Sequence, residues 1–214
     1  MSKRTKLVIF DYDGVLVNSF TICCMANELI GREFGQKSLL DDENAYRELF
    51  ETDWKQALAK WNIVDLKDIH RAEEIFDSIV TRYRWTIVPY PGVVDFLDYL
   101  KAEGYSVAIA SNNNKKNIVE RLENLGLLHH FSLVLDHTDG VKPDAKQIYT
   151  CLEHFGVGAD ETVMIGDMDG DMAAAKTAGL KKAIAVTYGF HPRHKLHLAD
   201  VMIDSPHLLK DVIE

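Results

Sequence analysis

The chain is poor in cysteine and carries no excess of positive charge. Both features restrict the classes of function that we expect for it. Only three cysteines occur among its 214 residues, Cys23, Cys24 and Cys151. An odd number with no C-x-x-C spacing argues against a disulfide framework or a zinc site, so we expect reduced thiols in the cytoplasm. The formal net charge of −9 at pH 7 argues against a nucleic-acid partner, because surfaces that bind nucleic acids are basic.

Long apolar runs are also absent. A membrane-spanning helix needs about 18 consecutive apolar residues, and no stretch approaches that length. Near the start, basic residues precede the short apolar run Leu7–Phe10, which stops at Asp11, so we expect neither a secretory leader nor a membrane partner. The remaining composition, 47% hydrophobic and 27% charged, is typical of a globular protein with one large domain or a domain plus an insert.

The most informative stretch is Phe10-Asp11-Tyr12-Asp13-Gly14. The apolar residues before it suit a buried parallel strand, and Gly14 allows the backbone to turn. Asp11 and Asp13 thus stand at the carboxyl end of a strand, where open α/β sheets bind ligands. Because neighbouring carboxylates repel each other unless a cation or proton lies between them, Mg²⁺ is the expected cation. A strand that ends in an ordinary polar turn is the alternative interpretation of this motif alone.

The block 18–85 is predicted to be helical. Apolar residues recur in it at helical spacing, and no clear strand occurs. Ser19 and Asp53 could cap helices, Asp41-Asp42 could open another, and a longer amphipathic helix is predicted over 65–83. Because the block is too long for a simple crossover between two strands, we expect a small inserted helical domain.

From residue 86 onward, predicted strands and helices alternate. The strands are short apolar runs bounded by glycine or polar turns, at 106–110, 131–135, 162–165, 183–186 and 201–203. The helices between and after them are predicted at 93–102, 115–125, 144–155, 168–178 and 206–213. Such alternation forms βαβ units. We therefore predict an α/β fold in which a doubly wound parallel sheet, made of residues 1–17 and 86–214, carries the inserted all-helical domain.

Three further polar sites lie at predicted strand ends or before helices. They are Ser111-Asn112-Asn113, Lys142-Pro143 and Gly166-Asp167-Met168-Asp169-Gly170-Asp171. A serine after a strand offers its hydroxyl and nearby backbone amides to an anion. Pro143 restricts the backbone of Lys142 to extended geometry, which holds the lysine at a defined place before a helix. Each site alone also suits a helix cap or a solvated charge, but four such sites in this order indicate one functional centre.

Together these motifs resemble those of the haloacid dehalogenase-like hydrolases. The matching residues are Asp11-Tyr12-Asp13-Gly14-Val15-Leu16-Val17-Asn18-Ser19, Ser111-Asn112, Lys142-Pro143 and Gly166-Asp167-x-x-x-Asp171. Pro91-Gly92-Val93, Gly126-Leu127 and Ala173-Ala174-Ala175-Lys176-x-Ala178-Gly179 resemble the branch that contains phosphoglycolate phosphatase and β-phosphoglucomutase. Val15 and Asn18 depart from the family's usual Thr and Asp, at positions that are not its main catalytic ones. The resemblance implies a Rossmann-like core with strand order five, four, one, two, three, and a helical cap at residues 18–85.

The resemblance also implies a Mg²⁺-dependent phosphatase that works through an aspartyl-phosphate. Asp11 would be the nucleophile, and its ordinary pKa of about 3.9 leaves it ionised without an activating base. Asp13 would be the general acid and base, which requires a raised pKa. Displacement of a halide needs no protonated leaving group, so an acid at this position favours phosphoryl transfer over dehalogenation.

The remaining motif residues receive roles from the same resemblance. Mg²⁺ would bind the carboxylates of Asp11 and Asp167 and the backbone carbonyl of Asp13. Asp171 would orient metal-bound water or the motif lysine. The phosphate-binding residues would be Ser111, Asn112 and Lys142. A sugar phosphomutase and a non-catalytic binding protein are the alternatives to a phosphatase, and the complete set of motifs argues against the second.

The substrate would be a small phosphorylated metabolite of the phosphoglycolate or sugar-phosphate class. The cap offers Arg47, Trp54 and Lys55 as candidate contacts: a substrate carboxylate would need a cation, and a sugar would need an aromatic face. The alternative is that Trp54 is buried in the cap and Lys55 is solvated.

Two features receive no role from the motifs. Asp169 is predicted to be a solvated charge at a helix start. His191, His194 and His197 recur at three-residue spacing without cysteine, and we predict a solvated loop and helix start there, not a metal site.

Overall fold

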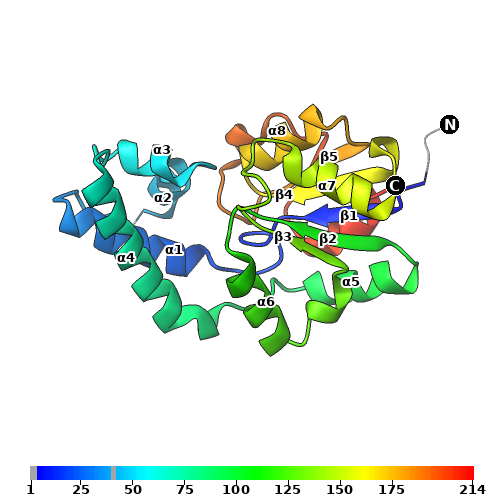
Figure 1. The fold of residues 1–214 in the computed structure, drawn as a ribbon, viewed down its shortest axis with the longest axis horizontal. Helices are drawn as coiled ribbons and strands as arrows, with labels where there is room; N and C mark the ends of the chain where they lie inside the picture. The colour runs from blue at the N-terminus through cyan, green and yellow to red at the C-terminus, as the bar shows by residue number, and fades with distance from the viewer. Residues whose placement is uncertain (1–3, 40–41) are drawn as a thin grey trace.

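The computed structural model of the protein describes residues 4–39 and 42–214. The helices that follow the first strand lie beside the part that contains the sheet (Figure 1). These are α1 (Phe20–Glu33), α2 (Glu43–Leu49), α3 (Trp54–Ala59) and α4 (Leu66–Tyr83). They fall inside the predicted cap, residues 18–85, and that this block is a separate domain remains a prediction. Within the described residues, no helix combines the length and apolar character needed to cross a membrane.

Six parallel strands form one sheet in the order β3-β2-β1-β4-β5-β6. Their bounds are β1 (Leu7–Phe10), β2 (Ser106–Ala110), β3 (Leu133–Leu135), β4 (Thr162–Gly166), β5 (Lys182–Val186) and β6 (Val201–Ile203). The predicted order is confirmed, with β6 added at one edge. Phe10 of β1 pairs with Ile109 of β2 on one side and Ile165 of β4 on the other. The loops that follow these three strands therefore meet at one edge of the sheet.

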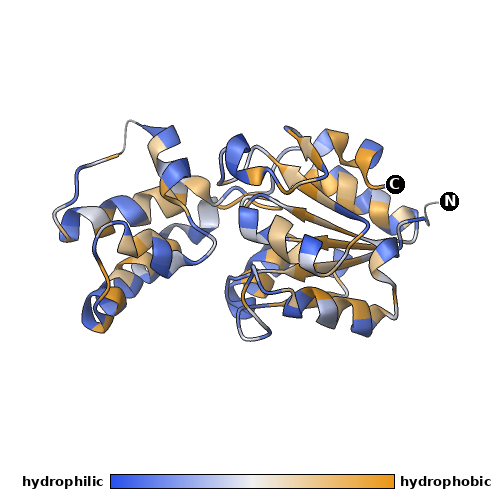
Figure 2. Ribbon diagram, turned by 90° about the horizontal axis from the view of Figure 1, so that it is seen from above, coloured by the Kyte–Doolittle hydropathy of each residue, from blue (hydrophilic) through white to orange (hydrophobic). Residues whose placement is uncertain are grey.

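Helices cover both faces of the sheet, as a doubly wound fold requires. They are α5 (Val93–Ala102), α6 (Lys115–Asn124), α7 (Lys146–Phe155), α8 (Asp169–Thr177) and the short α9 (Leu209–Val212). Side chains of β1 alternate between two apolar layers: Val8 and Phe10 pack with α5 and α6, whereas Leu7 and Ile9 pack with α7 and α8. Figure 2 shows the hydrophobic strands enclosed between these helices. The predicted α/β fold is confirmed.

Some predicted ends shift by a few residues. The strand expected at 131–135 begins at Leu133, because residues 128–130 form a 3-10 turn. The helix expected at 144–155 begins at Lys146, where the Asp144 carboxylate accepts a hydrogen bond from the Lys146 amide at 2.7 Å. The last predicted helix opens as a 3-10 turn at Pro206–Leu208.

The predicted caps of the inserted helices differ in what they do. Asp42 and Asp53 each accept a backbone N–H at 3.0 Å, from Ala45 and Lys55 respectively. Ser19 precedes α1 without a side-chain capping bond, and the helix expected at 65–83 begins one residue later, at Leu66. Asp41 lies outside the described residues.

Glu28 on α1 is the buried polar centre of the cap. Its carboxylate accepts hydrogen bonds from the Tyr46 hydroxyl at 2.7 Å, from Arg32 Nε at 2.8 Å and from the Leu39 amide at 3.1 Å. Burial raises the pKa of Glu28, but hydrogen bonds from Ser38, Tyr46 and Leu39 outweigh it and lower that pKa to about 2. Glu28 is therefore ionised and joins α1 to α2.

Two chain crossings connect the cap to the sheet-containing core. They run side by side, and the Asn18 amide donates to the Val88 carbonyl at 2.9 Å. The second crossing is also held by the core, because Arg121 of α6 donates from Nε to the Ile87 carbonyl at 2.8 Å. The cap is thus joined to the core at a narrow, hydrogen-bonded neck.

Candidate active site

A buried lysine joins two carboxylates at the carboxyl end of β1. Asp11 follows that strand directly and is 7% exposed. Lys142, 2% exposed, places its Nζ 2.9 Å from Asp11 Oδ1 and 2.5 Å from Asp171 Oδ1. Burial raises the pKa of Asp11, and Lys142 opposes this. Burial lowers the pKa of Lys142, but the two carboxylates outweigh it and raise that pKa, so the lysine is charged.

Asp167 completes an acidic cluster in the loop after β4. One oxygen from each of Asp11, Asp167 and Asp171 lies within 4.8 Å of the others. Asp171 Oδ2 is held by the amides of Asp167 and Met168 at 3.1 and 3.0 Å, which fixes the loop at the start of α8. Asp167 Oδ2 accepts from the Phe190 amide at 2.6 Å.

The donor set of this cluster fits a divalent cation. Asp167 Oδ1 is buried and has no hydrogen-bond partner among the described residues. Burial raises the pKa of Asp167, and the neighbouring Asp11 and Asp171 raise it further, while the Phe190 amide and Lys142 oppose the rise. Hard carboxylate oxygens are the ligands that Mg²⁺ prefers. Asp11 and Asp167 would hold such an ion, since both oxygens of Asp171 are engaged, one by Lys142 and the other by backbone amides, whereas Asp11 contacts Lys142 through Oδ1 alone.

Two glycines allow the backbone to approach Asp167. Gly14 has a φ of +75°, and a Cβ there would lie 2.1 Å from Asp167 Oδ2. A Cβ on Gly189 would lie 2.3 Å from Asp167 Cβ. A larger residue at either position would displace the carboxylate, so both glycines are part of the site.

Asp13 stands apart from the acidic cluster and bonds to the loop after β2. Its Oδ2 accepts from Asn113 Nδ2 at 2.7 Å, and the side chain is half-buried. Burial raises the pKa of Asp13, with Asn113 partly opposing. This is the direction that a proton donor at neutral pH needs. The sequence analysis placed Asn113 in the polar stretch after this strand but assigned it no role.

The predicted phosphate-binding residues lie at the same edge of the sheet. Ser111 and Lys142 are buried there, and Asn112 is half-buried. Ser111 is buried, and its Oγ accepts from the Asn113 amide at 3.2 Å. The Asn112 side chain brackets the lysine backbone, accepting from Lys142 N at 2.8 Å and donating to Lys142 O at 3.2 Å. Asn112 therefore positions Lys142. Gln147, which the sequence did not single out, donates to the carbonyl of Ser111 at 2.9 Å.

Of the three predicted cap contacts, only Arg47 reaches the core. Its Nη1 donates to the Gly189 carbonyl, and its guanidinium lies 4.5 Å from the centre of the Phe20 ring. Trp54 packs inside the cap, with its ring centre 5.8 Å from that of Phe76, and Lys55 is exposed. The turn before Trp54 does reach the core, but through Thr52.

The interpretation of the histidine stretch was wrong for its first member. His191 is fully buried; its Nδ1 accepts from the Asp169 amide at 3.1 Å, and its Nε2 donates to the Phe50 carbonyl at 3.0 Å. These two partners require the neutral ring, and burial lowers the pKa of His191 accordingly. His194 and His197, in and after the 3-10 turn Arg193–Leu196, are exposed as predicted.

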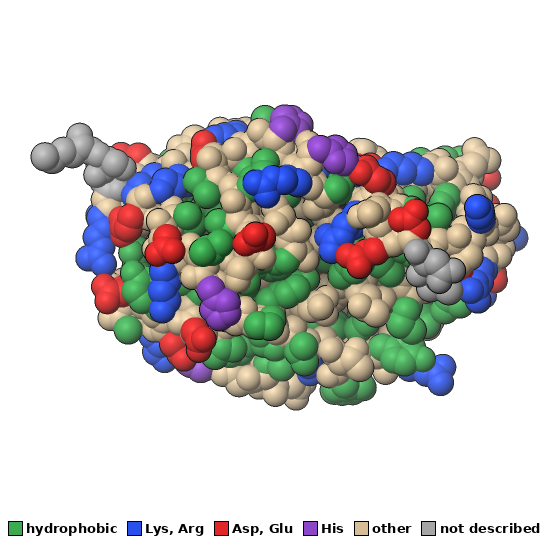
Figure 3. Space-filling model, turned by 180° about the vertical axis from the view of Figure 1, so that it is seen from behind, with side chains coloured by type: hydrophobic (Ala, Val, Ile, Leu, Met, Phe, Trp, Pro, Cys, Tyr) green, Lys and Arg blue, Asp and Glu red, His purple; other side chains and the backbone are tan. Residues whose placement is uncertain are grey.

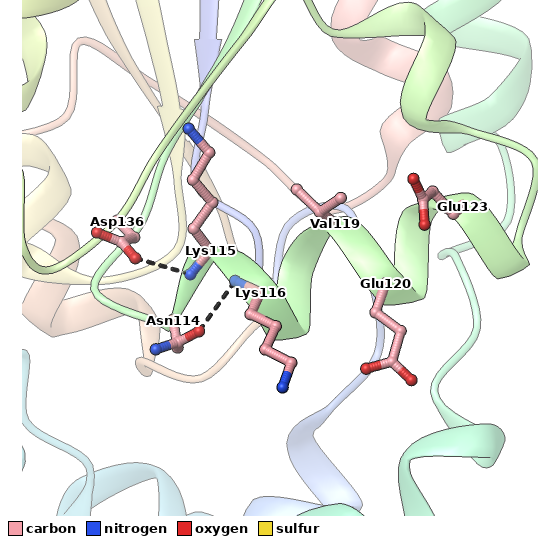
Figure 4. Close-up of a pocket in the computed structure, with 7 residues that line it drawn as sticks. All are labelled: Asn114, Lys115, Lys116, Val119, Glu120, Glu123 and Asp136. Carbon is pink, nitrogen blue, oxygen red and sulfur yellow. Dashed lines mark hydrogen bonds between the residues drawn. The ribbon is translucent and has the colours of Figure 1, made fainter.

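A separate surface hollow of about 710 Å³ lies over α6 (Figure 4). It is lined by Asn114, Lys115, Lys116, Val119, Glu120, Glu123 and Asp136. None of these residues belongs to the acidic cluster. Asp136 accepts from the Lys115 amide at 2.9 Å and so anchors the start of α6. The hollow is therefore not the site of the motif residues.

Comparison with known proteins agrees with this geometry. The profile of the haloacid dehalogenase-like hydrolases matches residues 8–185. Phosphoglycolate phosphatase from Chromobacterium violaceum is 31% identical over 222 residues, which cover 99% of this chain and 98% of that protein. Among solved structures, a haloacid dehalogenase-like family hydrolase from Streptococcus pneumoniae has a TM-score of 0.83 at 21% identity, covering 98% of this chain and 99% of its own. A predicted phosphoglycolate phosphatase from Haemophilus somnus has a TM-score of 0.83 at 22% identity, covering 99% of both chains. The chain belongs to the haloacid dehalogenase-like hydrolase family.

Proposed function

We propose that the protein is a Mg²⁺-dependent phosphatase that hydrolyses a small phosphorylated metabolite through an aspartyl-phosphate on Asp11. The observation that carries this proposal is the contact of buried Lys142 with both Asp11 and Asp171, beside the unpartnered oxygen of Asp167. A nucleophile, a fixed positive charge and a set of cation ligands are thus assembled at one sheet edge. Asp13, two residues after the nucleophile, supplies the acid.

In the first step a carboxylate oxygen of Asp11 attacks phosphorus, and the bond from phosphorus to the ester oxygen breaks. Asp13 gives its proton to the departing alkoxide. Lys142 offsets the negative charge that gathers when a carboxylate meets a phosphate dianion. When bound, Mg²⁺ would neutralise further charge on the phosphoryl oxygens, held by the carboxylates of Asp11 and Asp167 and the carbonyl of Asp13.

In the second step a water molecule attacks phosphorus of the aspartyl-phosphate. The ionised Asp13 takes the proton from that water, the Asp11–phosphorus bond breaks, and inorganic phosphate leaves. Asp11 returns to the carboxylate form and Asp13 to the acid form. The cycle needs no further reactant.

For the substrate we favour a carboxylated phosphate ester of the phosphoglycolate class. The relative from Chromobacterium violaceum carries that name, and Arg47 brings a cation from the cap to the junction with the core. A guanidinium pairs well with a substrate carboxylate. Trp54 and Lys55 lie away from this junction, and a part for them in substrate recognition stays a prediction. We place the reaction in the cytoplasm, where the unpaired thiols would remain reduced.

The test is release of inorganic phosphate from p-nitrophenyl phosphate with Mg²⁺ and with EDTA. We expect release only with Mg²⁺, and its loss in Asp11→Asn. Asp95→Asn, an exposed aspartate on α5, is the matched control and should retain full activity. No release with Mg²⁺, or an active Asp11→Asn variant, would refute the proposal.

The substrate class is tested on phosphoglycolate, glucose 6-phosphate and β-glucose 1-phosphate. We expect phosphoglycolate to give the highest kcat/KM, and Arg47→Met to lower that value while sparing p-nitrophenyl phosphate, which has no carboxylate. Isomerisation of the sugar phosphate without phosphate release would instead establish the mutase alternative.

A further inference from the structure

The turn between α2 and α3 of the cap touches the acidic loop of the core through Thr52. Its hydroxyl donates to Asp169 Oδ1 at 2.7 Å and accepts from the Gly170 amide at 3.1 Å. Amides in the first turn of a helix have no carbonyl partner within that helix. The Thr52 hydroxyl therefore supplies the acceptor that the Gly170 amide lacks within α8. A Cβ on Gly170 would come within 2.2 Å of Thr52 Cγ2, which shows how closely the two segments pack.

His191 makes a second link between the same segments. Its ring bridges the Asp169 amide of the core and the Phe50 carbonyl of the cap, at 3.1 and 3.0 Å. Because the side chain is fully buried, the ring nitrogen that faces the cap would lose its partner if the cap moved away. The backbone of His191 also donates to the Asp167 carbonyl at 3.3 Å.

Lys195 makes a third link that is remote from the acidic loop. Its Nζ donates to the carbonyls of Glu48 and Phe50 at 2.9 and 3.2 Å and lies 3.6 Å from the Glu51 carboxylate. All these partners belong to the cap. Lys195 therefore holds the cap against the core without a direct hydrogen bond or ion pair to the described residues 166–171, although it shares the Phe50 carbonyl with His191.

We propose that Thr52, His191 and Lys195 form a polar latch that couples closure of the cap to cation binding at Asp11 and Asp167. The loop that the latch grips, residues 166–171, carries both Asp167 and Asp171, so a closed cap fixes the carboxylates in place. By linkage, a cation that binds the fixed carboxylates more tightly must in turn favour the closed cap. The three residues position the loop and do not react. Asp169 accepts the hydrogen bond that Thr52 of the cap donates. The inference rests on the proposed function for the identity of the cation.

Two variants break the latch at different points. Thr52→Val removes both hydroxyl hydrogen bonds with almost no change of shape, and Thr52→Ser keeps them. Lys195→Ala removes the remote link only. Lys176→Ala is the matched control, because Lys176 pairs with Asp200 inside the core and touches no described residue of the cap through that pair.

Three measurements on the full chain report on the latch. Exchange of the Gly170 amide proton, followed by NMR, reports on the bond to Thr52; Mg²⁺ affinity by calorimetry reports on the carboxylates; and the radius of gyration from small-angle scattering reports on closure. For both Thr52→Val and Lys195→Ala we expect roughly tenfold faster Gly170 exchange, a several-fold weaker Mg²⁺ affinity and a larger radius. Thr52→Ser and Lys176→Ala should match the natural protein in all three.

The decisive variant is Lys195→Ala, because Lys195 has no direct bond to Gly170 and meets the latch only at the Phe50 carbonyl, which it shares with His191. Wild-type Gly170 exchange or wild-type Mg²⁺ affinity in this variant would overturn the coupling. A Thr52→Val variant with faster Gly170 exchange but unchanged Mg²⁺ affinity and radius would show a merely local contact and overturn it as well. Failure of the proposed function would appear differently, as no Mg²⁺-dependent phosphate release by the natural protein.

Discussion

Replacing Lys142 by Met should destabilise the protein strongly, and replacing Asp171 by Asn in the same chain should restore part of that loss. Lys142 Nζ lies 2.9 Å from one carboxylate oxygen and 2.5 Å from another, in a side chain that is 2% exposed. Met preserves the length of the side chain but removes its charge. Asp11 and Asp171 would then face each other, buried and uncompensated.

The size of the effect follows from the burial of the pair. Removing one partner of a buried ion pair costs about 3 to 5 kcal/mol, because the other charge is left without a counterion. Asp171→Asn keeps an oxygen for the amides of Asp167 and Met168, so its cost comes mainly from the lost charge. If the losses of stability caused by Lys142→Met and Asp171→Asn were additive, their sum would approach the whole free energy of unfolding of an ordinary domain. We expect the double variant to be about 2 to 3 kcal/mol more stable than additivity predicts.

The assay is urea unfolding in EDTA, so that no divalent cation takes the place of the ammonium group. Unfolding should be followed by far-UV circular dichroism. Fluorescence would not report on the core, because Trp54, Trp61 and Trp85 all lie in the predicted cap. Additive losses in the four-protein cycle would show that Lys142 and Asp171 do not stabilise each other, and would refute the interpretation of this contact.

Four further outcomes are expected. Asp13→Asn should slow hydrolysis of alkyl phosphates at least tenfold more than that of p-nitrophenyl phosphate, whose leaving group barely needs a proton; equal losses would make Asp13 structural. Asp167→Asn should raise the Mg²⁺ concentration for half-maximal activity about tenfold or more, and an unchanged titration would place the cation elsewhere. Gly14→Ala should also raise the Mg²⁺ concentration for half-maximal activity and should lower stability, since its Cβ would lie 2.1 Å from Asp167 Oδ2. A wild-type Mg²⁺ titration would contradict the packing argument. Glu28→Gln should destabilise the cap by roughly 2 kcal/mol in urea unfolding monitored by tryptophan fluorescence. Because the folded pKa of Glu28 is lowered from 4.5 to about 2, this contribution is complete above pH 4.5 and disappears as pH falls toward 2, so a loss that persists unchanged at pH 2 would contradict it.

The fold was readable from the sequence because its strongest signals are local. Leu7–Phe10 is apolar at every position, as a strand covered on both faces must be, and it was placed without error. The glycines and prolines that bound the later segments marked most element ends to within two residues. The start of the helix at Lys146 was missed because a side chain, Asp144, fixes the preceding turn.

The site was readable only in part. Asp11, Lys142, Asp167 and Asp171 meet because parallel strands end at one edge, which the order of motifs along the chain already indicated. The order of motifs along the sequence does not indicate which residues of the cap contact the core. His191 is a buried bridge because it bonds the Asp169 amide of the core and the Phe50 carbonyl of the cap, which lie far apart in the sequence.

The face shown in Figure 3 bears acidic and basic side chains intermixed, as a surface without a single-sign field does. The net charge of −9 therefore does not gather as a single-sign patch on this face.

The central place of β1 in the sheet has a consequence for how the protein is synthesised. This strand leaves the ribosome first, yet its neighbours are β2 at residues 106–110 and β4 at residues 162–166. All four helices of the cap are made before either neighbour exists. The nascent chain therefore carries the apolar strand Leu7–Phe10 without a neighbour until residues 106–110 have been made, and Asp11 at its end can reach Lys142 only when residue 142 has emerged.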